Sequence, residues 1–141
     1  MKALETLIRL RRDSLDRRRQ TLASLEQRRA DLTARQLELE RRITEEQSVA
    51  SANESLLFSY DGFARKSIQG RAQLEGIGRE LDSEIEAASE DLRQAFTELK
   101  KFEIARDQRD RREKIELDRQ DRRTGDELAL SRFRHDRLRS D

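Results

Sequence analysis

Few side chains in this chain could take part in chemistry, and their spacing argues against a catalytic site. The chain has one histidine, His135, and no cysteine, so a thiolate nucleophile, a cysteine zinc site or a Ser-His-Asp triad is not expected. Gly76 and Gly78 resemble part of a phosphate-binding loop, but no third glycine follows at the required spacing. The sequence therefore predicts a protein that is not an enzyme and that uses no cofactor and no metal.

The chemistry that remains is ionic, and much of it belongs to arginines near the beginning of the chain. Arg17, Arg18 and Arg19 are consecutive, so on a helix they point in three successive directions and at least one projects into solvent. Guanidinium groups favour carboxylates and backbone carbonyls, which indicates an acidic or carbonyl-rich protein surface as their counterpart. We predict a protein-binding end that contains Arg11, Arg17, Arg18 and Arg19. A merely solvated helix face is the alternative for any such run of charge.

Nucleic acid is a weaker candidate partner for these arginines. The runs lack interleaved aromatic residues, and acidic residues alternate with the basic ones between residues 107 and 121. Such carboxylates would repel phosphates. We therefore expect no nucleic-acid partner.

Aromatic residues form a second candidate binding surface. Phe58, Tyr60 and Phe63 are three of the six aromatic residues of the chain and lie within six positions. They could form a docking site for another protein, or they could close a turn by packing against each other. The sequence favours neither interpretation.

The elements that must position these residues are helices. The chain contains no proline, 43% of its residues are charged and 33% are hydrophobic, which is typical of long helices and not of a thick globular core. One heptad pattern of apolar residues begins at Leu4, and a second runs from Leu74 to Phe102. The predicted fold is all-α, an antiparallel two-helix coiled-coil hairpin that forms a single domain over residues 1–141.

We predict the first helix at about 2–54, the turn at about 55–62 and the second helix at about 63–135. Asp61-Gly62, the only Asp-Gly pair of the chain, is the turn signal. A reversal near residue 61 predicts that the numbers of facing residues sum to roughly 122.

This register makes specific predictions. Leu22 would face the Leu99–Phe102 region, Arg11 would lie near Glu113, and the last twenty or so residues would have no partner within the chain. Arg11, Arg18 and Arg29 fall on the apolar seam, where we favour snorkelling of the guanidinium to solvent over a role in specificity.

No stretch of the sequence approaches the roughly 18 apolar residues of a membrane span. The start of the chain also lacks an apolar signal region, since Arg9 interrupts its leucines. We therefore expect a cytoplasmic protein without direct membrane insertion.

The whole pattern resembles the FliJ family of the bacterial flagellar type III export apparatus and its injectisome counterparts of the YscO type. The resemblance rests on the Leu-rich start Met1–Arg11, on Ala95–Glu103 leading into a helix rich in Arg, Glu and Asp, and on Gly125–Ala129. Within these, Lys100–Glu103 matches the Lys-x-x-Glu stretch of the family and Asp126–Glu127 its late Asp-Glu.

This resemblance implies a stalk that inserts its terminal end into the hexameric export ATPase. It also implies contacts of the turn-proximal part with the cytoplasmic domain of the export-gate membrane protein, interaction with export chaperones, and peripheral association with the export apparatus at the inner membrane. Two alternatives stay open from the residues alone: a generic dimeric coiled-coil scaffold or tether unrelated to secretion, and a basic coiled coil associated with RNA or DNA.

Overall fold

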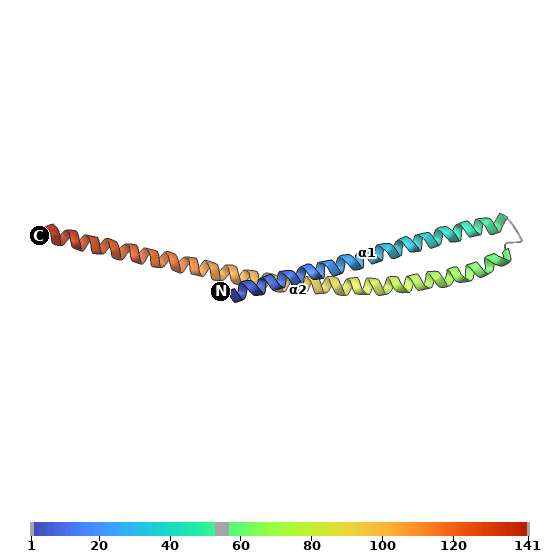
Figure 1. Cartoon of the computed structure of the whole chain (residues 1–141), viewed down its shortest axis with the longest axis horizontal. Helices are drawn as coiled ribbons and strands as arrows, with labels where there is room; N and C mark the ends of the chain where they lie inside the picture. The colour runs from blue at the N-terminus through green and yellow to red at the C-terminus, as the bar shows by residue number, and fades with distance from the viewer. Residues whose placement is uncertain (1, 53–56, 141) are drawn as a thin grey trace. The chain divides into compact units, whose positions relative to one another are not determined.

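The computed structural model describes residues 2–52 and 57–140, and all of them are helical. Helix α1 spans Lys2–Ala52 and helix α2 spans Leu57–Ser140. The two helices run antiparallel and pack against each other, which confirms the predicted all-α hairpin (Figure 1). The chain divides into two compact units, one made of Met1–Arg11 with Thr97–Asp141 and the other of Arg12–Phe96.

The unit 12–96 has a core one side chain thick between α1 and α2. Leu25 and Leu32 of α1 and Leu81 of α2 are buried and form one cluster, against which partly buried apolar side chains of α2 pack. Glycine in α2 allows close approach at one point, because a Cβ added to Gly78 would lie 3.3 Å from Cδ2 of Leu32. The side chain of Leu32 thus packs closely against the backbone of α2 at Gly78.

The register of this unit follows from ion pairs between described residues of the two helices. Arg18 Nη1 lies 2.9 Å from Asp91 Oδ1, Arg29 Nε lies 2.8 Å from Asp82 Oδ1, and Glu40 accepts two bonds of 2.6 Å from Arg71. The residue numbers of these pairs sum to 109, 111 and 111. The expected sum of roughly 122 was therefore wrong.

The physical reason for the shifted register is the position of the reversal. The predicted turn at about 55–62 and the predicted helix start at about 63 were too late, because α2 already begins at Leu57. Gly62 is helical without positive φ, and nothing lies within 4 Å of where its Cβ would be. Asp61 lies near the positive N-terminal end of α2 and 3.7 Å from Arg65, so it stabilises helix here and does not end it. The register of the interhelical ion pairs places Leu22 opposite about residue 88, not opposite Leu99–Phe102.

In the other unit, residues 2–11 of α1 pack on the part of α2 that begins at residue 97. Ile8 is 2% exposed and Leu99 is 4% exposed. Arg109 Nη2 lies 3.4 Å from Oε1 of Glu5. The predicted neighbour of Arg11 was wrong, since its guanidinium lies over the ring of Phe102, 5.6 Å from the centroid, and not beside Glu113.

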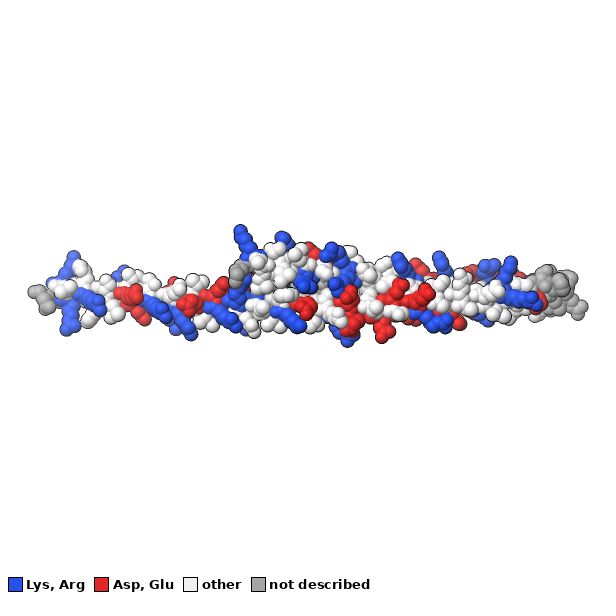
Figure 2. Space-filling model, turned by 90° about the horizontal axis from the view of Figure 1, so that it is seen from below, with Lys and Arg blue, Asp and Glu red and all other residues white. Residues whose placement is uncertain are grey.

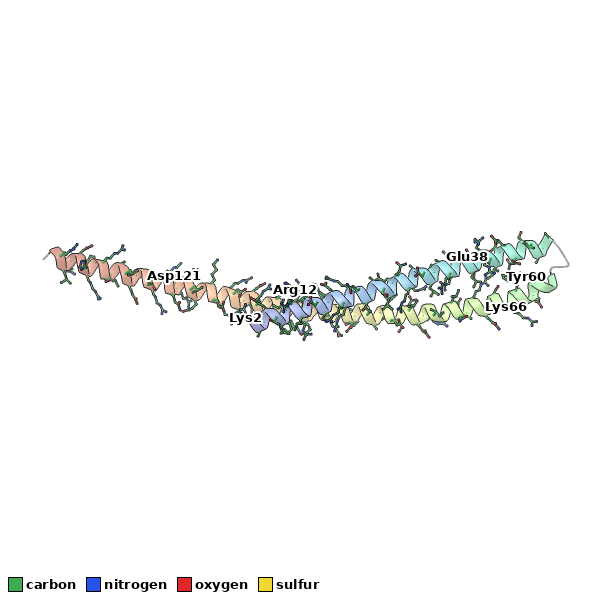
Figure 3. The ribbon with its side chains drawn as sticks, viewed as in Figure 1. Lys2, Arg12, Glu38, Tyr60, Lys66 and Asp121 are labelled. Atoms are coloured by element: carbon green, nitrogen blue, oxygen red, sulfur yellow. The ribbon has the colours of Figure 1, made fainter. Side chains whose placement is uncertain are left out.

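Beyond this contact α2 continues as a single helix. All residues from 111 to 139 are exposed, a longer stretch than the twenty or so expected. Figure 3 shows Asp121 on this segment with side chains projecting from the helix and no second helix beside it. We call residues 111–139 the exposed tail.

The Glu40–Arg71 pair predicts a specific acid sensitivity. Hydrogen bonds from Arg71 hold the pKa of Glu40 below its ordinary value of 4.5. A carboxylate with a lowered folded-state pKa stabilises the fold fully above its unfolded pKa, and this contribution is lost as the pH falls through the folded pKa. We expect Glu40→Gln to lower the denaturation midpoint at pH 7 and to flatten its fall below pH 4.5, measured by urea unfolding across pH. Glu46→Gln, at an exposed residue of the same helix, is the control, and equal effects of both substitutions would contradict the prediction.

Candidate protein-binding surfaces

The three consecutive arginines of α1 point in different directions, as their spacing predicts. Arg18 turns toward α2, where it pairs with the carboxylate of Asp91 and lies 3.4 Å from the backbone carbonyl of that residue. Arg19 is exposed and lies 3.6 Å from Asp16, one turn earlier on its own helix. Arg17 is exposed and forms no ion pair with any residue that the structure describes. Two of the three guanidinium groups are therefore available on the surface of unit 12–96.

The fourth predicted member of this end belongs to the other unit. Arg11 covers one face of the Phe102 ring, a cation–π contact that orients its stem while the residue as a whole stays exposed. Phe102 itself is only partly exposed. Arg11 is thus held by an aromatic ring and not by a carboxylate, and it keeps its hydrogen-bond donors for another acceptor.

The seam arginines do more than extend to solvent. Snorkelling is the favoured prediction for them, and Arg18 and Arg29 in addition bond carboxylates on α2 across the seam. Their side chains remain 37% and 31% exposed, so the stems pack while the charged groups stay near water. Aspartates at positions 82 and 91 were the available signal, but only the correct register brings them opposite these arginines.

At the turn end, two of the three predicted aromatic residues are described. The rings of Tyr60 and Phe63 are 6.3 Å apart between centroids and tilted by 38°, within the range of favourable aromatic contacts. Both residues are half-buried, and Figure 3 shows Tyr60 near the beginning of α2. The side chain of Phe58 lies outside the described residues. The Tyr60–Phe63 contact accounts for part of the cluster by internal packing, and the docking role stays a prediction.

The exposed tail carries apolar side chains that face water. More than half of the surface of each is exposed, and they are Ile115, Leu117, Leu128, Leu130, Phe133 and Leu138. Charged residues separate them, so they form no single stripe typical of a coiled-coil seam. A partner protein that surrounds the helix could cover these side chains, whereas a single flat partner surface could not.

The remaining features of the described residues are their metal-binding groups, their surface hollows and the apolar length of their helices. No group of three or more His, Asp or Glu side chains among them could hold a metal ion. The hollows on the surface of unit 12–96 are open and lined by a mixture of charged, polar and aliphatic side chains. None of the described helices is long and apolar enough to cross a membrane.

These features define a class of protein: a helical hairpin with charged surfaces and an unpartnered helical extension. The chain belongs to the family described as Flagellar FliJ protein, whose family model matches residues 1–138. No curated protein and no solved structure matches the chain. Membership assigns the chain to the flagellar protein export apparatus, and the family is a non-enzymatic component of that apparatus.

Proposed function

We propose that this protein is the stalk of the flagellar export apparatus that couples the hexameric export ATPase to the export gate. Its terminal end, with Arg11, Arg17 and Arg19, binds the ATPase ring. The turn-proximal part, with Phe58, Tyr60 and Phe63, binds the cytoplasmic domain of the gate protein. Export chaperones bind the same protein, which works in the cytoplasm at the inner membrane.

One observation carries this proposal most strongly. The exposed tail extends α2 beyond its contact with residues 2–11 and is uncovered along its whole length. Exposed isoleucine, leucine and phenylalanine side chains on a helix lower the solubility of the protein unless a partner covers them. A ring that receives the end of the hairpin would cover it on several sides at once.

The seam supports a stalk over a dimeric scaffold. The scaffold alternative needs the apolar seams of two chains to pair with each other. Here Leu25 and Leu32 of α1 are already buried against Leu81 of the same chain. One hairpin therefore satisfies its own seam, as a stalk requires and as the scaffold alternative does not.

The test is hydrolysis of ATP by the purified export ATPase with the hairpin added. We expect the wild-type protein to raise the rate, and we expect Arg17→Glu with Arg19→Glu to raise the concentration needed for half-maximal stimulation about 2- to 30-fold, because exposed ion pairs contribute about 0.2–1 kcal/mol each. Arg18 is left intact in this variant because its pair with Asp91 helps to hold α1 on α2.

A matched control reverses two basic residues elsewhere on the same unit. Arg65→Glu with Lys66→Glu changes the net charge equally at exposed residues of α2. This control should stimulate like the wild type. Equal stimulation by the Arg17/Arg19 variant would remove these residues from the ATPase contact, and absence of stimulation by the wild type would contradict the stalk function.

A further inference from the structure

A shallow surface furrow follows α1 in unit 12–96. It shares Arg17 with the predicted protein-binding end and is otherwise separate from the surfaces described above. Two adjoining hollows that share Arg28 make it up. Its charged residues are Arg17, Arg28 and Arg35 together with one carboxylate, Asp31, and Leu25 and Leu32 line it from α1. From α2, Ile77 projects into it and is 39% exposed. We call this the cationic furrow.

The arginines of the furrow rim are not used inside the hairpin. Arg28 and Arg35 are exposed, as is Arg17, and none of the three forms an ion pair with another described residue. This contrasts with Arg18 and Arg29, which bond aspartates of α2. The hairpin thus directs one set of arginines inward and leaves another set directed at solvent.

Charge is segregated between the two helices at this level of the hairpin. Residues 17–35 of α1 carry six arginines and two acidic residues, whereas residues 75–93 of α2 carry seven acidic residues and two arginines. The interhelical ion pairs place these two segments opposite each other. Figure 2 shows acidic side chains gathered over part of the molecule beside basic ones. The cross-section therefore has one basic helix and one acidic helix.

We propose that the cationic furrow is the contact face for a second copy of this chain. A two-fold axis parallel to the helices would lay α1 of each copy on α2 of the other, with residues 17–35 facing residues 75–93 at the same height. A two-fold axis perpendicular to the helices would instead lay α1 on α1 and bring like charges together. Charge complementarity thus selects a side-by-side pair of hairpins with their turn ends together.

Specific groups meet in this arrangement. Glu80 and Glu84 follow Ile77 by three and seven positions on α2, so they share its helix face. In the second copy they lie at the height of Arg28. The Ile77 side chains of the two copies lie at the same height beside the axis and supply the apolar centre.

The association is weak. The leucines that line the furrow already bury most of their surface inside the hairpin, so little apolar area besides Ile77 is gained. Exposed charge pairs add specificity more than affinity and are screened by salt. We expect a dissociation constant of about 10 µM to 1 mM at low salt.

The first experiment is sedimentation of the full chain over a concentration series at low and high salt. We expect a monomer that converts to a dimer as concentration rises at low salt, with the dissociation constant at least about tenfold higher in 0.5 M salt. A chain that stays monomeric up to about 1 mM at low salt would overturn the proposal and leave the furrow to a helix of another protein.

Charge exchange tests the predicted pairs. Arg28→Glu with Arg35→Glu, and separately Glu80→Lys with Glu84→Lys, should each lose self-association, and an equimolar mixture of the two variants should regain it as a heterodimer. Helix content by circular dichroism shows whether each variant is folded. Folded variants that associate like the wild type, or a mixture that does not associate, would contradict the pairing.

Disulfide formation tests the axis. Ile77→Cys should form a disulfide between two copies under mild oxidation, because the chain contains no other cysteine and the two side chains face each other across the axis. Ile68→Cys is the matched control, since Ile68 is also an exposed isoleucine of α2 but does not line the furrow. Equal crosslinking of both variants would contradict the proposed face.

These outcomes are independent of the proposed stalk function. A monomeric chain that still stimulates the export ATPase would remove only the furrow contact. A dimerising chain that gives no stimulation would remove only the stalk function.

Discussion

Replacing Leu32 by alanine is expected to lower the free energy of unfolding by about 2–4 kcal/mol. Leu32 is 5% exposed and packs with Leu25 and Leu81 in the core cluster of unit 12–96. This core is one side chain thick, so the substitution removes a contact that no second layer replaces. Urea unfolding followed by circular dichroism at 222 nm measures the change.

Leu37→Ala is the matched control for this prediction. Leu37 lies on the same helix and is 67% exposed, so its loss should change the free energy of unfolding by no more than about 0.5 kcal/mol. Equal costs for the two substitutions would mean that the seam of α1 does not face α2 as described. A measured cost at Leu32 below about 1 kcal/mol would contradict its burial.

Two glycines of α2 are expected to respond in opposite ways to alanine. Nothing lies within 4 Å of the Cβ position of Gly76, so Gly76→Ala should stabilise the helix by about 0.8–1 kcal/mol. At Gly78 the added Cβ would lie 3.3 Å from Leu32 Cδ2 and 3.5 Å from Arg29 Nη2. Crowding there offsets the gain in helix propensity, so Gly78→Ala should be neutral or destabilising.

A double-mutant cycle separates propensity from crowding at Gly78. In the background of Leu32→Ala the closest contact beside Gly78 is gone and only ordinary van der Waals contacts with Arg29 remain, so Gly78→Ala should stabilise there as Gly76→Ala does in the wild type. The free energies of unfolding of the four variants give the coupling. Absence of coupling between residues 32 and 78 would show that the helices do not approach closely at this point.

The fold could be predicted because heptad spacing is a local property of the sequence. The apolar residues of α1 and of α2 repeat at coiled-coil spacing whatever their partner is, and without proline neither pattern is interrupted. The register could not be predicted in this way, since it depends on where the chain reverses. Asp61-Gly62 looked like the reversal, but Asp61 lies in the first turns of α2 and pairs with Arg65.

From the sequence, the candidate surfaces could be predicted as individual exposed residues but not as groups of residues that lie together. Consecutive arginines guarantee that some project outward, and Arg17 and Arg19 do. Which arginine turns inward depends on the residue that lies opposite it, and the sequence alone did not identify Asp91 as the partner of Arg18. The furrow around Arg28 was missed for the same reason, because it is formed by α1 and α2 together.

The exposed tail has a consequence for how tightly it can be bound. A helix without tertiary contacts depends on propensity and neighbouring side chains alone, and Gly125 within this one lowers its propensity further. A partner that binds the tail holds every residue from 111 to 139 helical, and this lowers the conformational entropy of the chain. The free energy of the contacts with the partner must therefore offset this loss. Affinity at this end of the protein is set partly by pre-organisation, so substitutions that never touch the partner can still change it.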